Sequence, residues 1–267
     1  ILVSVDDHVV EPPTLFDQHL PERWKARAPK VVRKHNGSDV WVFEGDQLPN
    51  IGLNAVVGRC PEEYGVEPTS DDQMRPGCFD IHERVRDMNA NGVLASMCFP
   101  SFPAFCGQLW ARQPDKEIAR VMSQAYNDWH IDSWCAKHPT RFIPLATVPH
   151  WDANLIVEEV RRVHAKGCNA ITFPDNPAAA GLASLHDEVW EPMWKICNEL
   201  GIIINCHIGT GYSPPYPSMK SPIEAWITGM PISIANSAAD WITLDAFQRY
   251  PDLKMALSEG GIGWVPY

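Results

Sequence analysis

The chain has 267 residues, with 22 Lys and Arg against 33 Asp and Glu, which gives a formal net charge of −11. Hydrophobic residues make up 45% and charged residues 21%, so the chain can bury a large core and differs from disordered proteins. The acidic balance argues against nucleic acid and anionic membrane surfaces as partners, because both select basic patches.

The start of the chain and its cysteines indicate the cellular compartment in which the protein is expected. No apolar run approaches the roughly 18 to 20 residues that span a bilayer, and the start, ILVSVDDHVVEPP, lacks the features of a signal peptide. The eight cysteines contain no Cys-x-x-Cys pair, and several lie in apolar stretches, which predicts buried free thiols. We therefore expect a cytoplasmic protein that has no membrane partner.

The first apolar run, residues 2–8, is typical of a strand, and a long stretch rich in Pro, Gly and charge follows it over residues 9–79. This stretch contains DVWVFEGDQL, whose turn at Glu44, Gly45 and Asp46 predicts a small hairpin. Because the connection is so long, we expect it to form a lid or a small subdomain.

From residue 80 onward one unit recurs: an amphipathic helix, a Gly or Pro stop, and a short apolar strand. Asp80 and Asp152 are expected to cap their helices. Continuous apolar strands between helices indicate a parallel sheet and an α/β fold. The expected helices cover residues 80–92, about 116–138, 153–167, 189–201 and 239–251, and the strands lie near 93–99, 142–148, 168–173, 202–207 and 254–259.

This strand count predicts the architecture. A closed (β/α)8 TIM barrel needs eight strands, and the pattern contains six. We therefore expect a single barrel domain over residues 1–267, with the 9–79 insertion inside it and the last two strands beyond Tyr267. A doubly wound parallel sheet is the alternative.

Reactive side chains in parallel α/β folds gather at the carboxyl ends of the strands. The first strand ends with Asp6 and His8, the fifth with His207 and the sixth near Glu259. Residues i and i+2 of a strand face the same way, so Asp6 and His8 can both point inward. One carboxylate and two imidazoles suit a divalent ion, zinc first and manganese second, with a position left for an activated water.

Each of these side chains also has a simpler interpretation. Asp6 and His8 could cap a turn, His207 could be a core histidine, and Glu259 could be a solvated residue before two glycines. Their joint position at strand ends favours the metal site. His150 and Asp175 follow the third and fourth strands, and we predict that they bind substrate.

Several segments carry a family resemblance through essentially the whole chain: SVDDHVVEP, YNDW, FIPLATVP, NAITFP, LHDEVWEPMW, NCHIGTG and SEGGIGW. Together they resemble the amidohydrolase-related branch of the amidohydrolase superfamily. That branch includes aminocarboxymuconate-semialdehyde decarboxylase and non-oxidative decarboxylases of hydroxybenzoates. The resemblance implies a metal-dependent barrel and a homodimer. It also implies that Asp6, His8 and His207 bind the metal and that a fourth ligand, an aspartate, lies beyond residue 267.

The chain departs from that family pattern at the sixth strand, where Glu259 stands in place of a histidine before two glycines. Glu259 is then the expected catalytic residue that moves the proton. We expect a metal-dependent hydrolase that acts through a metal-activated water on a small aromatic or carboxylic substrate. Residues 9–79 and the loop 209–222 would enclose that substrate. The alternatives are a non-oxidative carboxy-lyase and a non-catalytic barrel that only binds ligands.

Overall fold

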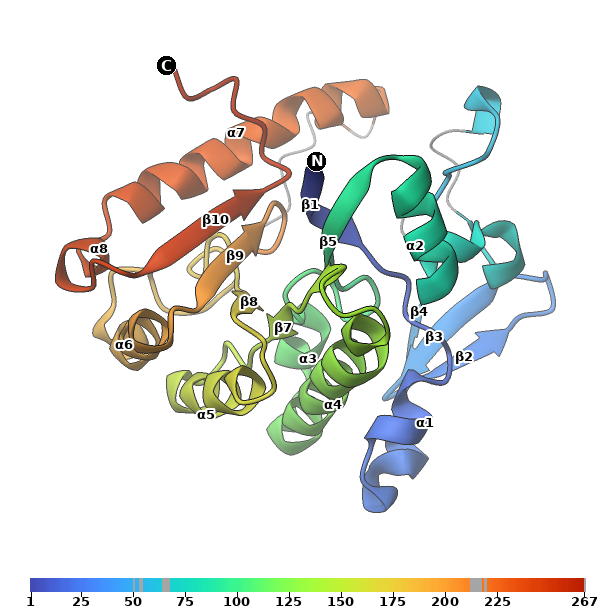
Figure 1. The fold of residues 1–267 in the computed structure, drawn as a ribbon, viewed down its shortest axis with the longest axis horizontal. Helices are drawn as coiled ribbons and strands as arrows, with labels where there is room; N and C mark the ends of the chain where they lie inside the picture. The colour runs from blue at the N-terminus through green and yellow to red at the C-terminus, as the bar shows by residue number, and fades with distance from the viewer. Residues whose placement is uncertain (50, 53–54, 64–67, 212–217, 219, 267) are drawn as a thin grey trace. The chain divides into compact units, whose positions relative to one another are not determined.

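The computed structural model describes residues 1–267 except 50, 53–54, 64–67, 212–217, 219 and 267 (Figure 1). The chain forms two compact units. Unit 1 comprises Ile1–Ala104 and Gln113–Ile143, and unit 2 comprises Phe105–Arg112 and Pro144–Tyr267. The single domain over residues 1–267 stays a prediction.

Unit 1 contains a parallel sheet in the order β1-β5-β6. The pairing of β1 with β5 sets Asp7 beside Cys98 and His8 beside Phe99. A register shift between Ser4 and Asp7 marks a bulge just before the end of β1. The strands and α-helices of this unit are β1 (Leu2–His8), α1 (Leu15–His19), β2 (Lys30–Arg33), β3 (Asp39–Phe43), β4 (Asp46–Leu48), α2 (Ile81–Ala90), β5 (Val93–Phe99), α4 (Lys116–Asp128) and β6 (Phe142–Ile143).

The long stretch after β1 has a sheet of its own. Strands β2, β3 and β4 are antiparallel, and the predicted hairpin is confirmed between β3 and β4, with φ of 48° at Glu44 and 91° at Gly45. Trp41 of β3 stacks on Phe102 with ring centroids 4.2 Å apart, and Phe16 meets both rings edge-on. This stretch therefore packs against the loop that follows β5.

Unit 2 contains a parallel sheet in the order β10-β9-β8-β7 (Figure 1). Helices α5 and α6 pack against each other. Phe173, just after β8, meets Trp190, Trp194 and Trp241 edge-on and forms an aromatic core with them. The strands and α-helices of this unit are α3 (Gln108–Arg112), β7 (Ala146–Thr147), α5 (Ala153–His164), β8 (Ala170–Thr172), α6 (Glu191–Leu200), β9 (Ile203–His207), α7 (Ile223–Ile242), α8 (Ala246–Arg249) and β10 (Lys254–Ser258).

Three predicted elements differ from the structure. The helix expected over 116–138 ends at Asp128 and continues as the π-helix Trp129–Trp134, in which Trp129 and Trp134 are paired at the i to i+5 spacing of such a helix. The strand expected over 142–148 forms two short strands, because Pro144 between them has no N–H to donate.

The helix expected over 239–251 is wrong. Its first residues belong to α7, which begins at Ile223, and α8 follows as a separate short helix. Pro231 lies inside α7, and an internal proline usually indicates a helix boundary, which is why the sequence pattern missed this helix.

The predicted helix caps are confirmed. The Asp80 side chain accepts hydrogen bonds from the N–H groups of His82 and Glu83, and that of Asp152 accepts from those of Asn154 and Leu155. Each cap satisfies donors that the first turn of a helix leaves without a backbone partner.

Replacing Asp152 with alanine should therefore lower the free energy of unfolding by about 1 kcal/mol, because the first turn of α5 loses two accepted hydrogen bonds. Urea unfolding of the wild type and the variant measures this change. Asn154→Ala, at an exposed position of the same turn, is the matched control and should change the value by less than about 0.5 kcal/mol. Equal losses in the two variants would contradict the capping role.

The cysteines behave as the sequence predicts: all eight are free thiols, and six of them are buried. Burial raises the pKa of Cys168 and of Cys197 to about 12, so both thiols stay protonated at neutral pH. In the part of the chain that the structure describes, no helix has the length and apolar character needed to cross a bilayer.

Candidate metal centre

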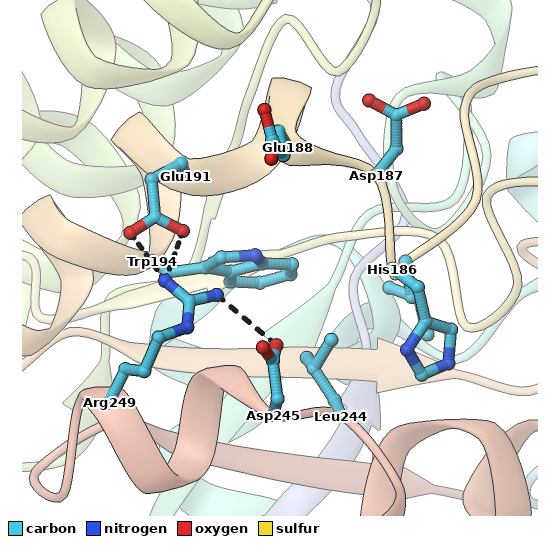
Figure 2. A pocket seen from close by; sticks show the side chains of 9 residues that line it. His186, Asp187, Glu188, Glu191, Trp194, Leu244, Asp245 and Arg249 are labelled. Atoms are coloured by element: carbon cyan, nitrogen blue, oxygen red, sulfur yellow. Dashed lines mark hydrogen bonds and ion pairs between the residues drawn. The ribbon is translucent and has the colours of Figure 1, made fainter.

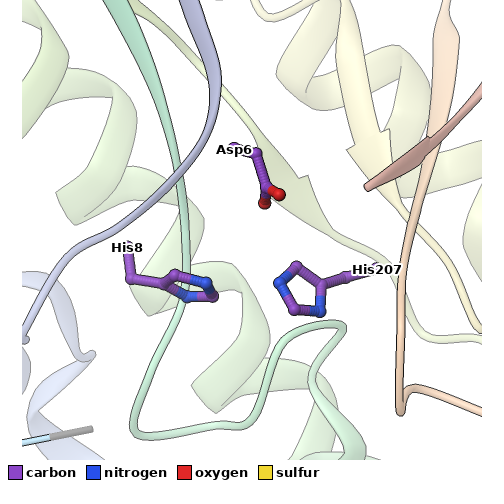
Figure 3. A group of neighbouring side chains, drawn as sticks. All are labelled: Asp6, His8 and His207. Atoms are coloured by element: carbon purple, nitrogen blue, oxygen red, sulfur yellow. The ribbon is translucent and has the colours of Figure 1, made fainter. Parts of the chain in front are cut away.

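Two of the predicted ligands lie on one strand. Asp6 and His8 are separated by one residue at the end of β1 and point to the same side (Figure 3). The intervening Asp7 instead accepts a hydrogen bond from the hydroxyl of Ser96 on the neighbouring strand β5. Arg84 donates to the carbonyl oxygen of His8 at 2.5 Å, which fixes the backbone at this residue.

A buried carboxylate fixes the segment that follows β1. Glu11 is 3% exposed, and its two oxygens accept the backbone N–H groups of Ser101 and Phe102, each at 2.8 Å. Ser101 also donates to the carbonyl oxygen of Val9 at 2.7 Å. The chain just after His8 is thereby held to the loop that follows β5.

Glu11 should make stability depend on pH. Burial raises the pKa of Glu11 from 4.5 to about 7, against the lowering effect of its backbone hydrogen bonds. Between pH 4.5 and 7 the folded state then binds more protons at this residue than the unfolded state. The contribution of Glu11 to stability is therefore largest below pH 4.5 and falls by about 3 kcal/mol as the pH rises to 7.

Urea unfolding at pH 5 and pH 8 checks this expectation. The difference in stability between the wild type and Glu11→Gln should change by roughly 3 kcal/mol in favour of the variant as the pH rises, since Gln does not ionise. A difference that stays constant across this range would show that Glu11 does not titrate as stated.

His207 is the last residue of β9 and is completely buried. Its Nδ1 donates to the carbonyl oxygen of Ile208 at 2.8 Å, which leaves Nε2 as the ring nitrogen through which a metal would bind. The ring of Phe105 packs against the imidazole with centroids 4.2 Å apart, which restricts its rotation.

Glu259 lies next to this histidine. One of its carboxylate oxygens, Oε2, is 2.9 Å from Nε2 of His207, and the side chain is 52% exposed. Glu259 has φ of 60°, a left-handed conformation that is strained for a residue with a side chain. Such strain is concentrated at functional sites. The following Gly260 has no room for a Cβ, which would lie 2.2 Å from Ile234 of α7.

The two residues predicted to bind substrate are buried in unit 2. His150 is 2% exposed and lies in the turn before α5, with its ring against Trp151. Asp175 is 1% exposed and accepts hydrogen bonds from Thr210, Gly211 and Ser237. Of the enclosing loop predicted over 209–222, residues 212–217 and 219 lie outside the described residues.

The side chains of the predicted ligands are of types that bind divalent metal ions. In unit 1, Asp6 and His8 offer a carboxylate and an imidazole from the end of one strand, and in unit 2, His207 offers an imidazole from the end of β9. Carboxylates and imidazoles are both ligand types that zinc accepts, at about 2.0 to 2.2 Å from the ion.

Unit 2 also has a surface cavity of about 540 Å³, which contains none of the predicted site residues (Figure 2). Its charged groups are partly paired: Arg249 donates to both carboxylate oxygens of Glu191 and contacts Asp245. Trp194 and Leu244 in its lining are almost fully buried. The cavity is therefore a surface depression whose lining includes neither His207 nor Glu259.

Sequence reasoning missed several residues that fix the predicted site side chains or the segments next to them. Glu11 lies in the quoted segment SVDDHVVEP, and a charged residue in an otherwise apolar run was the available signal. Phe105, Thr210 and Ser237 had no such signal, because only the folded chain brings them to His207 or Asp175.

Comparison with known proteins gives a consistent result. Residues 16–266 match the family described as Amidohydrolase. A curated 2-amino-3-carboxymuconate-6-semialdehyde decarboxylase of Dictyostelium discoideum is 27% identical over 195 residues, which cover 71% of this chain and 50% of that protein. The chain spans about half the length of the curated relatives that it matches.

Solved structures confirm the predicted barrel-type α/β fold class. An amidohydrolase of Mycobacterium avium subsp. paratuberculosis is similar with a TM-score of 0.72 at 21% identity, over 97% of this chain and 72% of that chain. A dihydroxybenzoic acid decarboxylase of Polaromonas, solved with bound manganese, has a TM-score of 0.57 at 18% identity, over 96% and 64% of the two chains.

Proposed function

The chain belongs to the amidohydrolase family, and on this premise we propose that it is a metal-dependent carboxy-lyase that removes CO₂ from a small aromatic or unsaturated carboxylic acid. The observations that carry the proposal are the Asp6 and His8 pair at the end of β1 in unit 1 and the buried His207 beside Glu259 in unit 2. The sequence favours hydrolysis first, but the curated relatives are decarboxylases, which supports the carboxy-lyase alternative.

The donor set fits a divalent cation. A carboxylate and two imidazoles are ligands that zinc and manganese both accept. When bound, such an ion polarises a substrate oxygen. Manganese bound to the Polaromonas decarboxylase supports manganese as the second choice, and zinc remains our first choice from the ligand types alone.

The chain's own residues then have distinct tasks. Asp6, His8 and His207 would hold the ion, while Phe105 and the carbonyl of Ile208 fix the orientation of the His207 ring. As the bond between the substrate carbon and its carboxylate breaks, the electron pair stays on that carbon, which takes up a proton. Glu259 supplies this proton from its carboxyl group and recovers one from solvent, since half of its side chain is exposed.

Hydrolysis is the second candidate, because Glu259 provides a carboxylate where the resemblance implies a histidine. A carboxylate acts as a general base toward water. In this case Glu259 would accept a proton from the attacking water instead of donating one to carbon.

One assay separates the two reactions. The full-length protein, stripped with a chelator and reloaded with Zn²⁺ or Mn²⁺, is tested for CO₂ release from hydroxybenzoates and unsaturated dicarboxylic acids, and for hydrolysis of lactones and amides. We expect metal-dependent CO₂ release. Hydrolysis without CO₂ release would favour the second candidate, and neither reaction together with no metal binding would refute the proposed enzyme.

A further inference from the structure

Asp175 is tied to three parts of unit 2 by its carboxylate. Oδ1 accepts hydrogen bonds from the hydroxyl of Thr210 at 3.0 Å and from the N–H of Gly211 at 2.5 Å. Oδ2 accepts from the hydroxyl of Ser237 at 2.6 Å. A buried carboxylate is costly unless its oxygens are hydrogen-bonded, and these three donors meet that requirement.

These donors come from elements that are distant in sequence. Thr210 and Gly211 follow β9, and Ser237 lies in α7, while Asp175 itself follows β8. Trp241 of α7 also donates its indole N–H to the backbone carbonyl of Asp175 at 2.9 Å. One aspartate therefore joins the ends of two neighbouring strands to a long helix.

Thr210 links this carboxylate to His207. Its hydroxyl oxygen lies 2.7 Å from the carbonyl oxygen of His207 and accepts the backbone N–H of Asp175 at 2.8 Å. The single hydroxyl hydrogen points either to Asp175 or to the His207 carbonyl. The Thr210 N–H donates to the same carbonyl at 3.3 Å, which closes the turn after His207.

Gly211 shows how close this approach is. A Cβ at this position would lie 2.4 Å from the backbone oxygen of Asn176 and 2.6 Å from its nitrogen. Only glycine lets the chain after β9 come near enough for its N–H to reach Asp175.

We propose that Asp175 is a positioning residue of the metal site: its contacts with Thr210, Gly211 and Ser237 fix the turn after β9 and so hold the imidazole of His207 in its ligand orientation. The inference rests on the proposed function. It differs from the substrate-binding role predicted for Asp175, because both carboxylate oxygens are already engaged by donors of the protein.

Two isosteric variants of the full-length protein test the inference. Asp175→Asn keeps the size of the side chain but turns an N–H₂ toward some of the donors, and Thr210→Val removes only the linking hydroxyl. Thr210→Ser keeps this hydroxyl and is the conservative variant. Thr228→Val is the matched control, because the Thr228 hydroxyl bonds within the exposed part of α7.

Two measurements are made on each variant. Hydrogen exchange of the metal-free protein reports on the turn at residues 208–211, and titration with Co²⁺ reports metal affinity and, through the visible spectrum, the ligand geometry. We expect faster exchange in this turn, Co²⁺ affinity lower by about 10- to 100-fold and an altered spectrum in Asp175→Asn and Thr210→Val. Thr210→Ser and Thr228→Val should resemble the wild type.

The possible failures are distinct. If the wild type binds no Co²⁺, the proposed metal function is wrong and the inference falls with it. If the wild type binds Co²⁺ and both isosteric variants match its affinity, spectrum and exchange, the inference alone is wrong. Should Asp175→Asn not fold, Thr210→Val decides the outcome, since a valine matches the size of threonine.

Discussion

Replacing His207 with alanine should remove most of the metal from the purified full-length protein and reduce turnover by more than about 100-fold. Losing an outer contact of a metal ligand typically costs 10- to 100-fold in affinity or activity, so losing the ligand itself should cost more. Metal content by elemental analysis and the CO₂-release assay measure the two effects.

A second variant separates ligation from folding, because His207 is fully buried and alanine leaves a cavity. His207→Asn keeps a donor near the position of Nδ1 for the carbonyl of Ile208 and loses only Nε2. His164→Ala, at the last residue of α5, is the control and should retain metal and turnover. Full metal content and activity in both His207 variants would remove this residue from the site.

Replacing Glu259 with glutamine should lower kcat by about 10²- to 10⁴-fold while metal content and fold are kept. Glutamine has nearly the same shape but does not exchange a proton, so it removes the proton transfer alone. Steady-state kinetics with the metal-loaded full-length protein measure the change, and KM should move far less than kcat.

Asp252→Asn is the matched control for this experiment, because it neutralises an exposed acid in the turn before β10. It should leave kcat unchanged. If Glu259→Gln loses metal instead of turnover, Glu259 acts as a ligand and not as the proton-transfer group. If it loses neither, another residue moves the proton.

Much of the secondary structure could be predicted from local pattern. The strands at β1 and β5 have the predicted bounds, and the caps of α2 and α5 and the hairpin turn at Glu44 and Gly45 are confirmed. Each depends on residues within a few positions of one another, where apolar spacing, capping chemistry and turn preference act directly.

Local pattern failed where distant packing or a proline decided the conformation. The π-helix Trp129–Trp134 and the long helix α7 with its internal Pro231 contradict the helices expected from spacing alone. In each case the aromatic or apolar contacts of the folded chain outweigh the intrinsic preference of the segment.

By itself the sequence determined the α/β class and the candidate residues of the proposed site, since Asp6, His8, His207 and Glu259 stand at the ends of strands that local spacing reveals. Only the tertiary structure decided which groups orient them. Glu11 accepts N–H groups some 90 residues away in sequence, and Asp175 accepts from residues 35 to 62 positions away. Buried carboxylates require donors, and only the folded chain brings those donors within reach.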